Sequence, residues 1–449
     1  SFQLSFLVFW GIVVLVPVFM HPFKSVRIGT LTHKLILFFM ASAAATAATI
    51  IPVAFYFHRT SLTGLISNFL IVPLLGYGAV VIGFSALPFV YLAPPVAKAL
   101  LLVAAYLVKL SDAIIMFLAK IPLLPLFNPT RLDLLLCCLF LISVTFFKKG
   151  RFRLGICVAL LLAFSLIRVM HGSPDRGKLA LTFFSVGQGE SILIDFPDGR
   201  HMLVDGGGNP GESVWDVGER LVAPALWKMG IGRLDYMVLT HPHPDHCKGL
   251  NYIAANFVIG EFWEGGSYPE CTEYRELMKV IRQQKIPVRR VNSASAALAI
   301  GGTEIRILAP FPGNNEKTPV DYLDMNDESV VFRVGLRRFS ALLTGDAGAA
   351  IEDRLLLHPE LLHSTILKVP HHGSRFSSTV PFLTAVAPRI AVISAGFRNS
   401  FHLPAQETLD KLSKMGIITY RTDLDGAVRV VCDPRRIDDV TVTTSGHFH

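Results

Sequence analysis

The stretch Thr240-His241-Pro242-His243-Pro244-Asp245-His246 ends an apolar run, Leu234–Thr240, that has the pattern of a β-strand. It gathers three imidazoles and one carboxylate on a loop stiffened by two prolines. Imidazole and carboxylate are ligands that zinc and related divalent metals bind in proteins. The alternate spacing aims His241 and His243 at one point, whereas the neighbours Asp245 and His246 can turn toward a second ion. Two-metal hydrolytic centres divide their ligands in this way, so the stretch predicts a metal centre at a strand end.

Later segments of the chain bring further polar side chains to strand ends. The predicted hairpin of Ser329–Val334 and Phe339–Leu343 is followed by Asp346. The predicted strand Ser364–Val369 is followed by His371, His372 and Ser374, and the predicted strand Ala391–Ser394 is followed by Asn399 and His402. We expect these residues to meet the first stretch at one edge of the sheets. Asp346 is well placed there to bridge two ions. His358 and His363 lie near a helical segment instead and are expected at the surface.

The sequence from Lys178 onward alternates short strands with helices. Gly, Pro, Asn and Asp turns separate the predicted strands Leu179–Val186, Ser191–Phe196 and His201–Val204, and a helix is predicted at Val217–Met229. Cys247, beside His246, is expected to be a small buried residue rather than a ligand. This half of the chain therefore has the pattern of an α/β domain.

The composition divides the chain into two halves of different character. The 449 residues are 51% hydrophobic and 17% charged, which excludes a disordered chain and exceeds one typical domain. Residues 1–170 hold 13 Lys or Arg and only Asp112 and Asp133 as acids, a charge of +11, whereas residues 171–449 hold 29 basic and 32 acidic side chains, a charge of −3. The basic excess of +8 thus lies in the apolar half, where it favours membrane-loop charge over nucleic-acid binding.

Six apolar stretches in residues 1–170 predict membrane helices. They are Leu4–Met20, Leu35–Phe57, Leu65–Val90, Val96–Ala119, Leu132–Phe147 and Leu154–Met170. A bilayer core needs roughly 17 to 25 helical residues for each span, and the fifth stretch is the marginal one. The chain begins at Ser1 directly on an apolar run with no basic region before it, which is not the pattern of a signal peptide and suggests that N-terminal sequence is missing.

Loop charges predict the orientation of these helices. The first, third and fifth loops carry seven Lys or Arg residues and the second and fourth carry three. Because Lys and Arg prefer the cytoplasmic side, the run Lys148–Arg153 is predicted to be cytoplasmic and the second half of the chain to lie outside. A re-entrant piece in the Pro-rich segment Ile121–Pro129 would alter this count.

These motifs resemble those of the metallo-β-lactamase superfamily and, in their order, those of ComEC-type competence proteins. The matching segments are Ser185–Ser191, Asp205-Gly206-Gly207, the HxHxDH stretch at 241–246, Leu343–Asp346, Lys368–Ser374 and the loop ending in His402, while Ser1–Leu7 resembles an internal part of the family's membrane domain. The resemblance implies an α-helical polytopic membrane domain of about six helices at residues 1–170, N-terminally truncated. An αββα sandwich domain of the metallo-β-lactamase type is implied at residues 171–449.

The resemblance also implies a division of the metal ligands between two divalent ions, zinc or manganese. His241 and His243 would hold the first ion, Asp245, His246 and His372 the second, and Asp346 would bridge them. Which of His371 and His372 ligates is open, and the other residue would support the site. Many superfamily members supply a further His to the first ion, but no His occurs between Cys247 and Asp346. Asn326 lies near that position, so the first site is expected to be weak, and one-metal catalysis stays an alternative.

The function implied is a DNA-uptake channel in the bacterial inner membrane, with an outer phosphodiesterase domain that acts on the incoming DNA. Asp245 or Asp346 would orient the attacking water, and His402 would contact phosphate or protonate the leaving oxygen. His371, Ser374, Asn399 and Asn326 are the candidate substrate-binding residues. The implied partners are DNA, the lipid bilayer and other DNA-uptake proteins, and the oligomeric state is open.

Two other interpretations remain open at the level of sequence. One is a transporter whose outer domain binds metal or DNA without cleaving it, and the other is a membrane-tethered hydrolase of another phosphodiester. Two basic clusters could hold phosphates or simply face water: Lys279, Arg282, Lys285, Arg289 and Arg290, and then Arg333, Arg337 and Arg338. Candidates for a polar path through the membrane are few: Ser67, Asn68, Lys98, Lys109 and Asp112.

Overall fold

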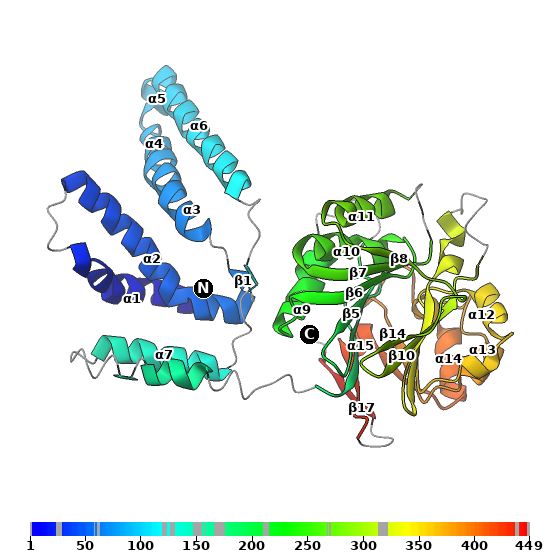
Figure 1. Ribbon diagram of the computed structural model, residues 1–449. Coiled ribbons are helices and arrows are strands. Elements are labelled where there is room, and N and C mark those ends of the chain that lie inside the picture. The colour runs from blue at the N-terminus through cyan, green and yellow to red at the C-terminus, as the bar shows by residue number, and fades with distance from the viewer. Residues whose placement is uncertain are drawn as a thin grey trace. The chain divides into compact units, whose positions relative to one another are not determined.

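The chain divides into two compact units in the computed structural model (Figure 1). One unit contains residues 1–171 with Trp227–Gly230, and the other contains the remaining residues. The structure describes residues 2–23, 29–57, 59–60, 63–118, 124–125, 131–146, 155–156, 158–165, 176–209, 215–266, 268, 271–312, 322–435 and 440–446.

The first unit is built of apolar helices. They are α1 (Phe2–Phe19), η1 (His21–Phe23), α2 (Thr30–Phe57), α3 (Thr63–Ile71), the π-helical η2 (Val72–Ala79), α4 (Val80–Ser85), α5 (Phe89–Leu92), α6 (Pro94–Leu118) and α7 (Arg131–Phe146), and the short strands β1 (Arg59–Thr60) and β2 (Leu124–Pro125) pair antiparallel. Four helical segments among the described residues are long and apolar enough to cross a bilayer: Phe2–Phe23, Thr30–Tyr56, Thr63–Ser85 and Pro94–Leu118. The first unit therefore has the helices of a membrane domain.

The predicted third apolar stretch differs from the structure at its end. Its helical segment stops at Ser85, and the turn that follows separates it from α5. The fifth stretch forms α7, whose apolar part, Leu132–Ser143, is shorter than a full span. The sixth stretch lies partly outside the described residues, as do the basic loop residues Lys148–Arg153.

Small residues let α1 and α2 approach closely. A Cβ added at Gly11 would lie 2.7 Å from Cβ of Ala48 and 2.8 Å from the carbonyl oxygen of Ala44. Close backbone approach at small residues is the usual basis of helix association in membranes, where burial of apolar surface adds little. Trp10 on α1 donates its indole N–H to the Thr145 hydroxyl on α7 at 2.9 Å, which links the first helix to the last of this set.

The second unit contains two β-sheets. The eight-stranded sheet has the order β17-β16-β3-β4-β5-β6-β7-β8, and the seven-stranded sheet has the order β15-β14-β13-β12-β11-β10-β9. The strands are β3 (Leu179–Phe183), β4 (Ile192–Asp195), β5 (His201–Val204), β6 (Arg233–Leu239), β7 (Val258–Glu264), β8 (Val288–Arg290), β9 (Leu298–Ile300), β10 (Thr303–Ala309), β11 (Val331–Leu336), β12 (Phe339–Leu343), β13 (Ile366–Lys368), β14 (Ile390–Ile393), β15 (Ile418–Arg421), β16 (Val428–Cys432) and β17 (Val440–Thr444).

Helices cover the outer faces of both sheets (Figure 1). The helices of this unit are η3 (Gly218–Val222), α9 (Ala223–Lys228), α10 (Pro244–Asn256), α11 (Thr272–Gln283), η4 (Tyr322–Glu328), α12 (Ala349–Leu355), η5 (Pro359–Leu361), η6 (Pro370–Gly373), α13 (Val380–Val386), α14 (Gln406–Lys414) and α15 (Thr422–Asp425). A buried core between the sheets includes Phe183, Trp263 and Phe332. A second core, with Phe382 and Leu412, packs the seven-stranded sheet against its helices. The predicted αββα sandwich is confirmed.

Strand direction explains why the polar loops meet. Strands β5 to β8 run parallel to one another, and so do β12 to β15. The carboxyl ends of parallel strands lie at one edge of a sheet, so the loops after β5, β6, β12, β13 and β14 gather there. The predicted hairpin is confirmed, because β11 and β12 pair antiparallel with Leu336 opposite Phe339. The predicted helix at Val217–Met229 begins as the π-helix η3 and continues as α9.

Candidate metal centre

The HxHxDH stretch forms the loop after β6 and the first turn of α10. Pro244 stands at the first helical position, where a missing N–H is tolerated and the fixed φ suits a helix. His243 precedes it in extended conformation, and its carbonyl oxygen accepts the backbone N–H groups of His246 and Cys247 at 3.0 and 2.9 Å. The turn of helix thus separates His241 and His243, on the loop, from Asp245 and His246, on the helix.

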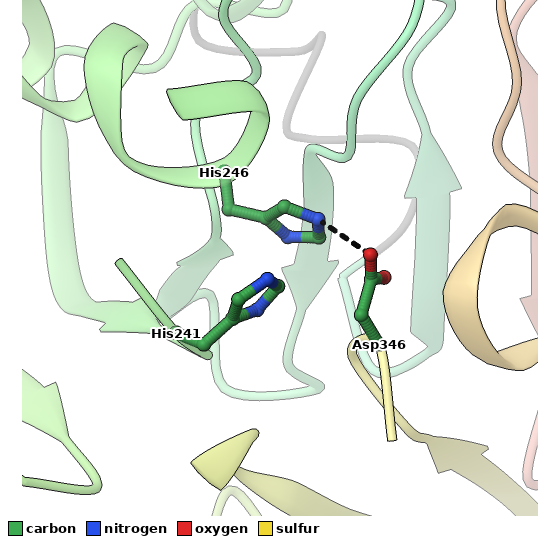
Figure 2. A group of neighbouring side chains, drawn as sticks. All are labelled: His241, His246 and Asp346. Carbon is green, nitrogen blue, oxygen red and sulfur yellow. Dashed lines mark ion pairs between the residues drawn. The ribbon is translucent and has the colours of Figure 1, made fainter. Parts of the chain in front are cut away.

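Four side chains from three segments converge on one point. Nε2 of His372 lies 3.2 Å from Oδ2 of Asp346 and 3.3 Å from Oδ2 of Asp245. Nε2 of His246 lies 3.4 Å from the same Asp346 oxygen and 3.3 Å from Nε2 of His372. Figure 2 shows the imidazole of His246 facing the Asp346 carboxylate. The predicted second set of ligands is therefore brought together, and His372 rather than His371 belongs to it.

The predicted first set is less complete. Nε2 of His241 lies 3.1 Å from Nδ1 of His243, so these two imidazoles face one another. His241 also forms a possible ligand group with His246 and Asp346, with all ligand atoms within 4.8 Å. Among the described residues, no such group of three contains His243. Asn326 lies on η4 with its side-chain oxygen buried and without a hydrogen-bond partner, and no described contact joins it to the histidines.

The ring nitrogens that face away from the centre are held by acceptors. Nδ1 of His246 donates to Oδ2 of Asp205 at 2.7 Å, and Nδ1 of His372 donates to the carbonyl oxygen of Ser394 at 2.9 Å. Carboxylate and carbonyl oxygens only accept, so each ring carries its proton on Nδ1 and leaves Nε2 for the centre when neutral. Metal-binding histidines are usually oriented by such partners. Nδ1 of His241 lies 3.1 Å from the Thr240 hydroxyl.

The mutual approach of these groups shifts their pKa values in the absence of metal. Burial alone would lower the pKa of His372, but Asp346 and then Asp245 raise it to about 9. Burial likewise opposes the shift at His246, where Asp346 and Asp205 raise the pKa well above its usual value. Burial would raise the pKa of Asp346, yet His372 and His246 hold it well below its usual range. Burial lowers the pKa of His241.

A buried ion pair lies beside the centre. Lys368, the last residue of β13, forms an ion pair with Glu190, and its Nζ lies 3.5 Å from Oδ1 of Asp346. The same ammonium donates to the carbonyl oxygen of Gly345 at 2.8 Å. Lys368 and Glu190 are both fully buried.

Sequence reasoning missed four residues of this site as functional residues: Asp205, Glu190, Lys368 and Ser394. The first three stand inside the family-like segments Asp205-Gly206-Gly207, Ser185–Ser191 and Lys368–Ser374. Two sequence signals could have indicated them: Asp205 is an acid directly after a predicted strand, and Lys368 is a lysine near the end of an apolar strand. Ser394 acts through its backbone carbonyl, which no residue type reveals.

Other predicted site residues lie apart from the ligand cluster. His402 is exposed and has no described side-chain contact with the cluster. The Asn399 amide is used within its own loop, where its oxygen accepts from the backbone N–H groups of Phe401 and Leu403. The Ser374 hydroxyl accepts from the backbone N–H of Phe376, and His371 is half-buried beside His372.

The remaining expectations about His and Cys agree with the structure. His358 and His363 are exposed, as expected, and Cys247 is buried. Asp245 keeps 22% of its side chain exposed, which makes it the cluster member that faces solvent.

The donor set fits divalent metal ions. It offers imidazole nitrogen and carboxylate oxygen, buried, with the other ring nitrogens already satisfied. Without a cation, three acids stand around His246 and His372: the buried Asp205 and Asp346 and the partly exposed Asp245. A cation between them would compensate that charge.

The fold and this donor set define a domain of the metallo-β-lactamase superfamily, and the model of that family matches residues 185–396. The model of the competence protein family matches residues 1–151. These matches, together with two curated relatives, make the chain a ComEC-type competence protein, which pairs a membrane domain with a metallo-β-lactamase domain.

The two relatives are longer than this chain. Competence protein ComA of Neisseria gonorrhoeae is 29% identical over 272 residues, which are 60% of this chain and 35% of that protein. ComE operon protein 3 of Bacillus subtilis is 23% identical over 447 residues, 96% of this chain and 55% of that protein. The chain thus spans about a third to about half of their lengths. Among solved structures, the diiron β-hydroxylase CmlA of Streptomyces venezuelae is 15% identical, with a TM-score of 0.36 over 61% of this chain and 59% of that one.

Proposed function

We propose that the chain is part of a membrane DNA-uptake protein whose soluble domain hydrolyses phosphodiester bonds of incoming DNA with divalent metal. The observation that carries the proposal is the convergence of Asp245, His246, His372 and Asp346 on one point, with their ligand atoms 3.2 to 3.4 Å apart. The match to the competence family at residues 1–151 supports DNA as the substrate.

The residues would divide between two ions, zinc or manganese. Asp245, His246, His372 and Asp346 would hold one ion, and His241 and His243 would hold the other and share Asp346. Because His243 stands outside every described group of three ligands, the first site is the weaker one. When bound, such ions lower the pKa of water to about 7 and stabilise negative charge on phosphoryl oxygens.

The protein side chains supply orientation and proton transfer. Asp205 and the Ser394 carbonyl fix the tautomers of His246 and His372, so the donor atoms need no rearrangement. Asp245, partly exposed, is placed to orient the attacking water, and Asp346 shares that role from the buried side. His402, exposed on the loop after β14, would reach the leaving oxygen as a general acid.

The candidate substrate-binding residues act mainly through the loops. Asn399 shapes the loop that carries His402, because its oxygen accepts two backbone N–H groups there. Ser374 does the same after η6, and its carbonyl oxygen accepts from Thr408 and Ser377. His371 and Asn326 complete the proposed phosphate-facing set.

The membrane half completes the proposal. Residues 1–170 would form the channel domain and residues 171–449 the hydrolase domain on the outer side of the bacterial inner membrane, acting with other DNA-uptake proteins. The expected polar path is not assembled by any described contact. Asn68, Lys98, Lys109 and Asp112 are each exposed within the first unit.

The test uses the full chain in detergent, stripped of metal and supplied with Mn²⁺ or Zn²⁺, against labelled single- and double-stranded DNA. We expect metal-dependent cleavage that is lost in Asp346→Asn and strongly reduced in His243→Ala. His358→Ala is the matched control, because that histidine is exposed and apart from the centre. Absence of cleavage with either metal, or equal cleavage by Asp346→Asn, would contradict the nuclease function.

A second function is favoured by one observation. The incomplete first site suits a domain that binds metal and DNA without hydrolysis. In that case the full chain would retain DNA in a metal-dependent manner and leave it intact. Cleavage of a phosphodiester lipid but not of DNA would instead identify a tethered lipid hydrolase.

A further inference from the structure

Lys368 occupies an unusual position for a lysine. It ends β13 with its side chain fully buried, next to the metal-centre residue Asp346. A buried ammonium is costly unless it is paired and hydrogen-bonded. Here the Glu190 carboxylate supplies the ion pair and the Gly345 carbonyl oxygen accepts a hydrogen bond at 2.8 Å.

The two oxygens of Asp346 face different partners. Oδ2 lies 3.4 and 3.2 Å from Nε2 of His246 and of His372, whereas Oδ1 lies 3.5 Å from Nζ of Lys368. Lys368 therefore contacts the Asp346 oxygen that is not the one nearest the two imidazoles.

The place filled by the ammonium is itself a potential metal position. Glu190, Asp346 and His372 form a third group whose ligand atoms all lie within 4.8 Å of one another. The Lys368 ammonium contacts the two carboxylates of this group. Oε1 of Glu190 and Oδ1 of Asp346 are buried and accept no hydrogen bond among the described residues. The negative charge on these two oxygen atoms is therefore compensated by a cation and not by hydrogen-bond donors.

We propose that Lys368 is a positioning residue. Its ammonium is a fixed cation between Glu190 and Asp346 that keeps divalent metal out of this third group. Because the ammonium holds one Asp346 oxygen, only the other oxygen faces His246 and His372. Lys368 touches neither substrate nor reacting atoms in this role. The inference deepens the proposed function, because it concerns the same metal centre.

Charge and shape both support this role. An ammonium is a compact point charge, whereas a guanidinium is a planar fork, so Lys fits a pocket between two single oxygens. Its charge repels a dication from the Glu190 side, and this repulsion is strong in a buried site. Without Lys368, Glu190 would be an unpaired buried carboxylate beside two further ligands, Asp346 and His372.

The experiment measures Mn²⁺ binding rather than activity. Full chain in detergent, stripped of metal, is titrated with Mn²⁺, and free Mn²⁺ is followed by its electron paramagnetic resonance signal. For Lys368→Met we expect one more bound Mn²⁺ per chain than for the wild type, because the third ligand group is open. For the double variant Lys368→Met/Glu190→Gln we expect no additional ion, because the carboxylate that would hold it is gone.

Two further variants keep the result interpretable. Lys368→Gln retains a donor toward the Gly345 carbonyl while losing the charge, and it should gain the same ion if the Met variant fails to fold. Lys411→Met is the matched control, because Lys411 is a partly buried lysine that donates to the carbonyls of Ser377 and Ser378. It should bind Mn²⁺ as the wild type does.

An unchanged Mn²⁺ stoichiometry, with affinity within twofold of the wild type in the folded Lys368 variants, would overturn the proposal. So would a loss of thermal stability with no change in Mn²⁺ binding, because that is the result of a purely structural pair. The proposed nuclease function fails separately: a wild-type chain that binds Mn²⁺ but cleaves no DNA contradicts that function and leaves the role of Lys368 standing.

Discussion

Asp205 and His246 form a fully buried hydrogen bond of 2.7 Å across the base of the metal centre. The same carboxylate accepts the backbone N–H and the hydroxyl of Thr240 at 2.8 and 2.6 Å. Asp205 thus joins the loop after β5 to the loop after β6. Asp205 also fixes the orientation of the His246 ring, so that Nε2 faces Asp346 and His372.

Replacing Asp205 by Asn should weaken metal binding without removing a ligand. The amide no longer attracts the Nδ1 proton as a carboxylate does, and partners of this kind usually change metal affinity by 10- to 100-fold. We expect Mn²⁺ affinity to fall within that range, measured by titration of the full chain. Asp195→Asn is the matched control, since Asp195 makes a similar 2.8 Å contact with His201 away from the ligands. An affinity equal to that of the wild type would contradict the orienting role.

Replacing His372 by Ala should weaken Mn²⁺ binding far more than replacing the adjacent His371 by Ala. His372 supplies a ring nitrogen to the cluster, whereas His371 does not belong to any described ligand group. We expect His372→Ala to lower Mn²⁺ affinity by about 100-fold and His371→Ala to change it by less than threefold. The same titration separates the two, and a reversed order would assign the ligand to His371.

Close backbone packing beneath the site predicts a costly glycine substitution. A Cβ at Gly249 on α10 would lie 2.0 Å from the carbonyl oxygen of Gly206, so the backbone must move. Overpacking of this kind costs about 1 to 3 kcal/mol or more. We expect Gly249→Ala to lower the thermal midpoint of the second unit, followed by circular dichroism of the full chain. Gly232→Ala is the control, because nothing lies within 4 Å of a Cβ there, and equal midpoints would refute the packing role.

The raised pKa of His372 predicts how the metal-free chain responds to pH. Burial opposes the shift, but Asp346 and Asp245 raise the pKa to about 9 from an unfolded value near 6.5. The protonated ring therefore contributes stability that is complete below about pH 6.5 and is lost as pH rises through about 9. Thermal melts in chelator should show this decline, and His372→Gln should flatten it. Mn²⁺ affinity should change in the opposite direction and rise with pH, because the ion displaces these protons.

The basic residues of α11 should carry DNA affinity if DNA is the substrate. Lys279, Arg282 and Lys285 are exposed, whereas Arg333 and Arg337 of the other cluster donate to the carbonyls of His363 and Pro434. Neutralising the three residues on and after α11 should reduce the slope of log affinity against log salt by about 2 for single strands. The measurement uses Asp346→Asn, which we expect to leave DNA intact. Neutralising Arg333, Arg337 and Arg338 should change the slope less, and the opposite order would move the DNA contact to the hairpin.

Sequence patterns predicted the strands that lead into the ligand cluster but missed β7 to β10 and β15 to β17. The strand His201–Val204 has the predicted bounds, and Phe339–Leu343 pairs with its neighbour as expected. Such agreement has a simple cause: apolar alternation decides where strands form, and parallel strands gather their carboxyl ends at one edge. The polar side chains after those strands are therefore visible before the fold is known.

The sequence patterns could not predict contacts that depend on the tertiary fold. The pairing of Lys368 with Glu190 joins residues far apart in the chain, and the orientation of His372 depends on a backbone carbonyl. His371 and His372 both have left-handed backbone, with φ of 50° and 53°, and only the tertiary fold places His372 rather than His371 among the possible ligand groups. No residue pattern of two adjacent histidines indicates which ring such a turn will bury.

The centre draws its ligands from both sheets, and this has a consequence for how the protein is made. His246 and His372 are 126 residues apart, and Asp346 lies between them in the chain, in the turn after β12. A growing polypeptide that has emerged only as far as β10 holds HxHxDH but neither Asp346 nor His372. Metal capture by the complete ligand set therefore awaits synthesis of most of the second unit. A chain cut short before β13 would contain His246 and Asp346 but not His372, so its ligand set would be incomplete.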